Sequence, residues 1–308
     1  MRFLITGGAG FIGSALSNQL VSMGHQVRVL DDLSAGEQSR LDSRVAFTRG
    51  DIRDIPKLWT LLRGVDCVYH LAARVYVQES ILYPVEYNDV NVGGTVSLMT
   101  AARDAGVKRV ILASSGAVYG EQAEQPARET AMVRPQTPYA VSKMAAEGYV
   151  QALGALNAIE TVILRIFNAY GPGQAIPPSN PPVIPKLLKQ ALTGGSLVIY
   201  GQGTQTRDFI YISDVVQAMI AAATATGING SIINVGSGRQ VSINDLADVI
   251  EEVVGHSTHR LYSNAQSGGV YQLVADISLA RKKLGFKPKV ELLKGLQLLL
   301  EQDPQFAA

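Results

Sequence analysis

Tyr139 and Lys143 are four residues apart on a segment with a helical pattern, so both side chains lie on one face of the expected helix. A tyrosine has an ordinary pKa of about 10, and an ammonium group within hydrogen-bonding range can move it by about 1–3 units. A phenol with an ammonium group beside it could therefore give and take a proton near neutral pH. The spacing is common in helices, so the elements around it must decide its meaning.

A glycine-rich turn near the N-terminus has the residue types that bind a dinucleotide. Gly7, Gly10 and Gly13 follow a short apolar run and open a helical pattern. They permit a tight turn, a close approach to a pyrophosphate and close packing of helix on strand. The helix N-terminus offers N–H groups to the phosphates. Asp31 ends the next strand and is suited to the adenosine ribose, which favours NAD over NADP. In the weaker alternative, Asp31 and Asp32 only end a strand.

Strand and helix patterns alternate through the first half of the chain, which predicts a parallel sheet with helices on both faces. The expected fold class is α/β, a Rossmann doubly wound parallel sheet with a smaller α/β C-terminal domain for substrate. We expect the NAD-binding domain over 1–169, with about 208–237 returning to the sheet through a strand at Ile232–Val235, and the substrate domain over 170–308. Long helices are expected at Val85–Ala105 and Tyr139–Leu153.

Two later segments have clear local signals. Residues 171–185 hold six prolines and two glycines, which predicts a loop, and a loop of that length is usually functional. Val241–Val254 is amphipathic, and its Ser242 and Asp245 are suited to cap a helix N-terminus.

Composition excludes several classes of function. The 308 residues are 47% hydrophobic with a net charge of +1, so no bulk field favours nucleic acid or an anionic membrane. No apolar stretch reaches the length of a membrane span. The single cysteine, Cys67, lies in an apolar run and fits a reducing, cytoplasmic compartment as a buried hydrophobe. The four histidines show no metal-ligand spacing, so no metal site is expected.

An ordered set of motifs resembles the extended short-chain dehydrogenase/reductases of the NAD-dependent epimerase/dehydratase branch, which act on nucleotide sugars. The matching segments are 6–13, Gly50–Asp54, His70–Ala73, Asn91–Thr95, Ser114–Gly120, Tyr139–Lys143, Arg165–Gly173 and Thr206–Tyr211. Each could arise by chance, but the ordered set is highly specific and extends through Ala275-Asp276-Ile277.

The resemblance implies a role for each matching residue. Tyr139 is the implied acid/base, Lys143 its cationic neighbour, and Ser115 a hydrogen-bonding partner of the same substrate oxygen. The implied NAD contacts are Gly7, Gly10, Phe11, Ile12, Gly13, Asp31, Asp51, Ile52, Leu71, Ala72, Ala73, Tyr139 and Lys143. From spacing alone, Asp51 is equally well explained as a solvated turn residue.

The reaction type follows from one departure. Dehydratases of the family carry an Asp-Glu pair after the catalytic Ser or Thr, and related decarboxylases keep a Glu, whereas Gly116 and Ala117 stand here. The resemblance then favours a nucleotide-sugar 4-epimerase working through a 4-keto intermediate, with UDP-glucose and UDP-galactose as the default pair. The alternatives are a reductase of nucleotide-keto-sugars that consumes NADH or NADPH, a UDP-glucuronate epimerase or decarboxylase, and a non-catalytic NAD-binding protein.

The substrate side rests on resemblance as well. Asn168 and Arg207 match diphosphate contacts, Val183 begins the family's Val-Ile-Pro segment, and Tyr200 matches a wall beside the nucleobase. Arg207 could instead pair with Asp208 or another acid, and Tyr200 could be core.

Gln266 replaces the family's second diphosphate arginine, and Arg260 lies near enough in sequence to compensate. Arg74 is a candidate cation for a glucuronate carboxylate, and the alternative is a solvated loop arginine. The resemblance also implies a homodimer through the two long helices, whose Ala101, Ala102, Ala145 and Ala146 would permit close approach.

Overall fold

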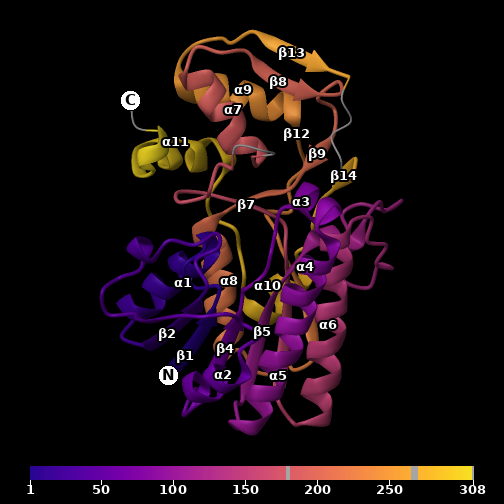
Figure 1. Cartoon of the computed structure of the whole chain (residues 1–308). Helices are drawn as coiled ribbons and strands as arrows, with labels where there is room; N and C mark the ends of the chain where they lie inside the picture. Colours follow the sequence, from indigo (N-terminus) through magenta and orange to yellow (C-terminus); the bar gives the residue numbers. More distant parts are fainter. Residues whose placement is uncertain (178–180, 265–269, 307–308) are drawn as a thin grey trace.

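A computed structural model describes residues 1–177, 181–264 and 270–306 of the chain (Figure 1). Its centre is a seven-stranded, wholly parallel sheet in the order β3-β2-β1-β4-β5-β6-β11. The strands are β1 (Arg2–Thr6), β2 (Gln26–Asp31), β3 (Ala46–Arg49), β4 (Cys67–His70), β5 (Arg109–Ser115), β6 (Glu160–Ile166) and β11 (Ser231–Val235). The order reverses between β1 and β4, which is the Rossmann arrangement that the sequence predicts and which opens a crevice at their carboxyl ends.

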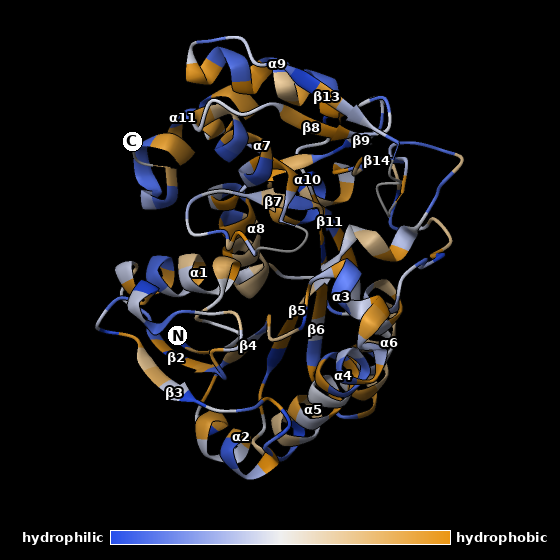
Figure 2. Ribbon diagram, turned by 45° about the horizontal axis from the view of Figure 1, so that its top comes forward, coloured by the Kyte–Doolittle hydropathy of each residue, from blue (hydrophilic) through white to orange (hydrophobic). Residues whose placement is uncertain are grey.

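Helices cover both faces of this sheet, as Figure 1 shows. One face carries α2 (Ile55–Leu62), α5 (Gly94–Asp104) and α6 (Pro138–Leu156); the other carries α1 (Phe11–Ser22), α8 (Ile212–Thr224) and α10 (Ser278–Leu284). The strand period of two separates the cores: Phe3 and Ile5 join the cluster with α1 and α8, whereas Leu4 joins the one with α2 and α5. The covering helices carry both hydrophobic and hydrophilic residues (Figure 2), as helices with one buried face must.

A second, smaller part lies beyond the carboxyl ends of the strands (Figure 1). It contains α7 (Val183–Leu192), α9 (Ile243–Val254) and α11 (Leu292–Gln302), packed on one another. Its strands are β8 (Leu197–Tyr200), paired with β13 (Arg260–Ser263), and the three-stranded set β12 (Val241–Ser242), β9 (Thr206–Arg207) and β14 (Gln272–Leu273). A short 3-10 turn at Pro304–Phe306 follows α11.

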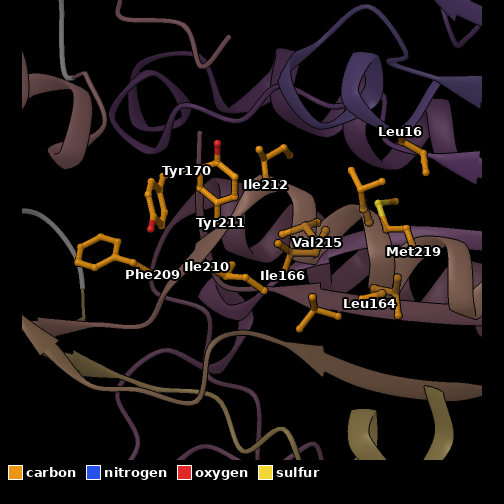
Figure 3. Close-up of a cluster of buried hydrophobic side chains, with 14 of the residues drawn as sticks. Leu16, Leu164, Ile166, Tyr170, Phe209, Ile210, Tyr211, Ile212, Val215 and Met219 are labelled. Atoms are coloured by element: carbon orange, nitrogen blue, oxygen red, sulfur yellow. The ribbon is translucent and has the colours of Figure 1, made fainter. Parts of the chain in front are cut away.

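One hydrophobic cluster joins the two parts. β7 (Asn168–Tyr170) and β10 (Phe209–Tyr211) pair in parallel where the chain leaves and re-enters the sheet region. Figure 3 shows Tyr170 beside Tyr211 at one side of this cluster and Leu16 and Met219 at the other. The Tyr170 and Tyr211 ring centroids are 5.5 Å apart. Aromatic and aliphatic packing therefore fixes the smaller part against α1 and α8.

The structure corrects the predicted helix at Val85–Ala105. That span contains α4 (Pro84–Asn88), a π-helical turn (η2, Asp89–Gly93) and then α5, with α3 (Val77–Leu82) just before it. A π turn shifts the register of the helix, which a hydrophobic pattern does not reveal, and such turns often mark functional sites.

Three other predictions can be compared with the structure. Residues 178–180 of the predicted loop over 171–185 lie outside the described residues, and the loop ends earlier than predicted because α7 begins at Val183, with Pro185 tolerated in its first turn. The predicted cap is confirmed: Ser242 Oγ accepts from the Asp245 N–H at 3.0 Å, and the Asp245 carboxylate accepts from the Ser242 N–H at 3.0 Å. Cys67 is fully buried, as predicted. No helix in the described ranges is long and apolar enough to cross a membrane.

Candidate active site

The turn between β1 and α1 is closed by glycines that no other residue could replace. Gly7 has φ +70°, and a Cβ there would lie 2.6 Å from the Ala72 nitrogen. A Cβ at Gly13 would lie 2.2 Å from the carbonyl oxygen of Gly7. The absent side chains let α1 begin directly against the strand ends, so its first N–H groups face the crevice.

Asp31 is fixed at the end of β2 by the same turn. Its carboxylate accepts hydrogen bonds from the Ala9 N–H at 3.0 Å and the Leu33 N–H at 2.8 Å, while burial raises its pKa above the ordinary value. Two oxygens held by backbone donors keep lone pairs free for ribose hydroxyls. Asp31 is therefore more than the end of a strand.

A cavity of about 670 Å³ runs along the carboxyl ends of β1, β2, β4 and β5. Every residue that the resemblance assigns to NAD lines it: Gly7, Gly10, Phe11, Ile12, Gly13, Asp31, Asp51, Ile52, Leu71, Ala72, Ala73, Tyr139 and Lys143. At one end, Asp51 accepts from Arg53 Nε at 2.9 Å and Arg53 lowers its pKa, so it stays ionised. The glycine cradle, the acid at β2 and the length of the cavity fit a dinucleotide.

Three side chains converge at the other end of this cavity. Ser115 is the last residue of β5, and its Oγ accepts from the Ala117 N–H at 3.2 Å as the cap of a 3-10 turn (η3, Gly116–Tyr119). Tyr139 lies in the first turn of α6, whose N-terminus is capped by Thr137. Lys143 follows one turn later and donates from Nζ to the Ala113 carbonyl at 2.7 Å. All three line the cavity.

Burial sets the proton affinities of the pair. It raises the pKa of Tyr139 above the ordinary value, and the Ser115 hydroxyl partly opposes that rise. Burial also lowers the pKa of Lys143 to about 8, against the attraction of Glu147. The lysine can thus carry its charge at neutral pH, and a positive charge next to Tyr139 favours the phenolate.

The π turn supplies a residue whose positioning role the sequence did not indicate. Asn91, which is buried, donates to Ser142 Oγ at 2.9 Å, and Ser142 in turn donates to the Tyr139 carbonyl at 2.8 Å. The Asn91 amide also accepts from the Arg74 N–H at 2.7 Å and donates to the Arg74 carbonyl at 3.0 Å. Asn91 therefore fixes the cavity wall after β4 against the first turn of α6.

Gly116 and Ala117 occupy the positions where dehydratases of the family place acids. Gly116 is buried, and a Cβ on it would lie 3.2 Å from the ring of Phe167. A longer side chain at this position would therefore require the Phe167 ring to move.

Of the residues assigned to substrate, Ser115 lines this cavity and the other four lie outside it. Asn168 is exposed on β7, Val183 begins α7, Tyr200 ends β8 and Arg207 ends β9, and only their neighbours Phe167, Ala169 and Pro182 line the cavity. Tyr200 is 40% exposed, so the core alternative is wrong, and Lys186 Nζ lies 4.1 Å from its ring centroid.

Three arginines clarify the substrate side. Arg207 Nη1 donates to the Thr206 carbonyl at 2.7 Å, while Asp208 is occupied by Ser237, Gly238 and Ala275; the predicted alternative of an Arg207–Asp208 ion pair is therefore wrong.

Arg260 pairs with Asp248 at 2.6 Å and Glu251 at 2.8 Å. These two carboxylates neutralise the positive charge that the sequence suggested as a replacement for the missing arginine at Gln266. Gln266 itself lies outside the described residues. Arg74 lines the cavity and pairs with Glu86 at 2.5 Å, so it is not merely a solvated loop residue.

Comparison with known proteins decides the family. The profile of the NAD-dependent epimerase/dehydratase family matches residues 3–236. The chain belongs to this family. A UDP-glucose 4-epimerase of Mycolicibacterium smegmatis is 36% identical over 98% of each chain.

Two solved structures are also similar to this chain. The UDP-glucose 4-epimerase of Thermotoga maritima with UDP-glucose has a TM-score of 0.94 at 32% identity, over 98% of both chains. The UDP-glucuronic acid 4-epimerase of Bacillus cereus with UDP-glucuronic acid and NAD has a TM-score of 0.91 at 33% identity, over 100% of both chains. The resemblance inferred from the ordered motifs is confirmed, and the cofactor of this family member is NAD.

Arg40 is a cavity residue that carried no signal in the sequence. Arg40, on a 3-10 turn (η1, Gln38–Arg40), pairs with Glu37 and donates to the carbonyl of Gly173, which lies on the opposite wall. Gly173 belongs to the proline-rich segment, so the composition of that segment was a usable signal. Nothing in the local pattern singles out Arg40.

Proposed function

We propose that the protein is an NAD-dependent nucleotide-sugar 4-epimerase whose catalytic residues are Ser115, Tyr139 and Lys143. The observation that carries the proposal is their convergence at one end of the dinucleotide cavity, at the carboxyl end of β5. The named relatives and solved neighbours, which are UDP-sugar 4-epimerases, support it. The absence of an acid at Gly116 and Ala117 favours epimerisation over dehydration.

In this proposal each residue has a task. Ser115 and Tyr139 hold the sugar hydroxyl at carbon 4, and Tyr139 Oη takes its proton as the carbon–oxygen bond becomes a carbonyl. Lys143 favours the phenolate before this step. NAD, when bound, would supply a reversible hydride acceptor for carbon 4. After the 4-keto sugar turns about its phosphate linkage, Tyr139 gives the proton back to the alcohol of opposite configuration.

The substrate is a UDP-hexose, with UDP-glucose and UDP-galactose as the pair. Asn168 and Arg207 bind the diphosphate, and Val183 and Tyr200 border the nucleobase. Their positions support this role, since Asn168 and Val183 begin β7 and α7 and Arg207 and Tyr200 end β9 and β8. A neutral hexose is favoured over glucuronate because Arg74 is already paired with the Glu86 carboxylate.

The same proposal covers organisation and location. Residues 1–169 with about 208–237 form the NAD-binding domain, residues 170–308 form the nucleotide-sugar domain, and the protein is a cytoplasmic homodimer.

The proposed dimer face keeps the two helices expected from the sequence, with contact residues other than three of the four alanines. Ala101, Ala102 and Ala146 are buried inside the subunit, where they fill the core under α5 and α6, so they cannot line an interface. Large apolar side chains on α3, α4 and α6 and between them are instead exposed: Ile81, Leu82, Tyr83, Val85, Val141 and Tyr149. An exposed apolar patch of this kind supports association.

The test uses purified protein without added NAD, incubated separately with UDP-glucose, UDP-galactose and UDP-glucuronate. Proton NMR follows the sugars, and absorbance follows NADH. The proposal expects the carbon-4 epimer of the two hexoses with no lasting NADH signal. Steady NADH consumption with a nucleotide-keto-sugar, and no epimer from any of the three, would identify a reductase instead.

A further inference from the structure

A buried ion pair lies beside the catalytic helix and takes no part in the chemistry above. Glu147 is 4% exposed and Arg165 is 3% exposed, and neither lines the cavity. The carboxylate accepts from Arg165 Nε at 2.9 Å and Nη2 at 2.7 Å. Because two charges removed from water are often no more stable than a well-packed apolar pair, stability alone does not explain this pair.

The pair is connected to the strand that ends in the catalytic serine. Glu147 Oε1 accepts from Ser114 Oγ at 2.5 Å, and Lys143 Nζ donates to the Ala113 carbonyl at 2.7 Å. Two successive turns of α6 therefore hold two successive residues of β5. The next residue of the strand is Ser115, so these contacts fix the separation between Ser115 and α6.

Glu147 also faces the charge of Lys143, one helical turn away. The other groups around Lys143 offer no negative charge at neutral pH: His70 on β4 is neutral because burial lowers its pKa to about 3, Tyr139 is a phenol until it ionises, and Arg165 on β6 is cationic. Among the described residues, Glu147 is the acid that opposes the loss of the Lys143 charge by burial.

Arg165 is held rigidly on the far side of Glu147. Its guanidinium carbon lies 4.7 Å from the centroid of the Tyr119 ring, and the Tyr119 hydroxyl donates to Asn234 Oδ1 at 2.7 Å. Glu129 accepts from the Asn234 N–H at 2.9 Å behind this layer. The carboxylate of Glu147 therefore has a fixed cationic partner.

We propose that Glu147 is a positioning residue for the catalytic pair: it fixes the end of β5 through Ser114 and keeps the Lys143 ammonium charged, with Arg165 as its anchor. The proposal rests on the proposed function only in naming Lys143 as catalytic. It predicts a measurable property of Lys143 that a purely structural ion pair would not affect.

The direct test is the titration of Lys143 in NAD-bound protein with ¹³C-labelled lysine, with the signal assigned by its loss in Lys143→Met. Two variants are compared with wild type: Glu147→Gln, and a double variant, Glu147→Met with Arg165→Met, that leaves no unpaired buried charge. The expected result is a fall in the Lys143 midpoint by about one pH unit in both.

The matched control is Glu160→Gln, which breaks the Arg109–Glu160 ion pair at the opposite end of β5 and β6. It should leave the midpoint unchanged. A double variant with the wild-type midpoint would overturn the proposal, even if Glu147→Gln gave little folded protein.

Steady-state kinetics provide a second measurement. The alkaline limb of kcat should move down by about one pH unit, and at the wild-type midpoint kcat should fall about fivefold, since the charged fraction drops from about one half to about one eleventh. KM should stay within about twofold because Glu147 is not in the cavity wall.

The two proposals fail separately. The titration needs no substrate, so a shifted midpoint in a protein without epimerase activity would overturn the proposed function alone. An active epimerase with an unshifted midpoint would overturn the positioning role alone.

Discussion

The Tyr139 hydroxyl begins from an unfavourable position for a base, because burial raises its pKa above the ordinary tyrosine value. Its neighbours must reverse that shift before it can take a proton at neutral pH. Ser115 contributes a hydrogen bond and Lys143 a positive charge, and the latter is itself close to losing its proton, with a pKa of about 8. The site is thus a set of opposed shifts rather than one strongly perturbed group.

Replacing Tyr139 with Phe tests the base directly. The variant keeps the ring and its packing but removes the proton acceptor, so kcat should fall by about 10²–10⁴-fold while NAD binding is retained. Epimer formation measured by NMR checks the first point, and NAD content after purification checks the second. Tyr149→Phe, on the exposed face of the same helix, is the control and should keep full activity. Wild-type activity in Tyr139→Phe would require another base.

At the scale of elements, the glycine turn decides whether α1 can approach the cofactor. In Gly13→Ala the new methyl would meet the Gly7 carbonyl, which is backbone and cannot move aside. We expect at least about a tenfold loss of NAD affinity, measured by titration calorimetry on the apoprotein. Gly148→Ala on α6, where a Cβ meets no atom within 4 Å, should leave NAD affinity unchanged. Equal affinities in both variants would contradict the assigned role of the turn.

The elements around the π turn are tied together by His70. Thr95 Oγ1 donates to the Asn91 carbonyl at 2.5 Å, so it accepts from His70 Nε2, and Nδ1 must then accept from Thr6 Oγ1. This buried imidazole links β1, β4 and the helix that carries the turn only while it is neutral.

Acid should therefore weaken the fold through His70. Its pKa is about 3 in the folded chain and about 6.5 in the unfolded chain, so the unfolded state binds an extra proton between these values. Stability is retained above pH 6.5 and falls with acidification by up to about 1.4 kcal/mol per pH unit. Urea unfolding of wild type and His70→Asn at several pH values measures this slope. In the variant, the slope of the free energy of unfolding against pH should correspond to about one bound proton fewer. Identical slopes in the two proteins would exclude His70 as the source.

The sequence could predict the features that depend on residues close together in the chain. Gly7, Asp31 and Tyr139 lie at strand ends and helix starts, so local patterns place them and the parallel topology brings them together. The π turn at Asn91 leaves no mark on hydrophobic spacing. The contact of Arg40 with Gly173 joins residues 133 apart, and the Arg260 ion pairs depend on α9 packing beside β13. No local pattern encodes such contacts.

At the scale of the whole molecule, the exposed apolar residues on α3, α4 and α6 predict association. Leu82 is 72% exposed and Val85 is 70% exposed, on neighbouring helices. Val85→Asp should convert a dimer to a monomer, because a charge in an apolar interface loses its hydration without gaining a partner. Light scattering after size exclusion measures the mass. Leu261→Asp, on the distant β13, is the control, and a monomeric wild type would contradict the predicted interface.

The packing of Phe167 beneath Gly116 has a consequence for how new reactions could arise from this chain. A methyl group at Gly116 would lie 3.2 Å from the Phe167 ring, so a larger acid placed there in one substitution would require the ring to move. The easiest order of changes is therefore a smaller residue at Phe167 first and an acidic side chain at Gly116 second. Because Phe167 also lines the cavity, that first change would reshape the active-site wall before any elimination chemistry could arise.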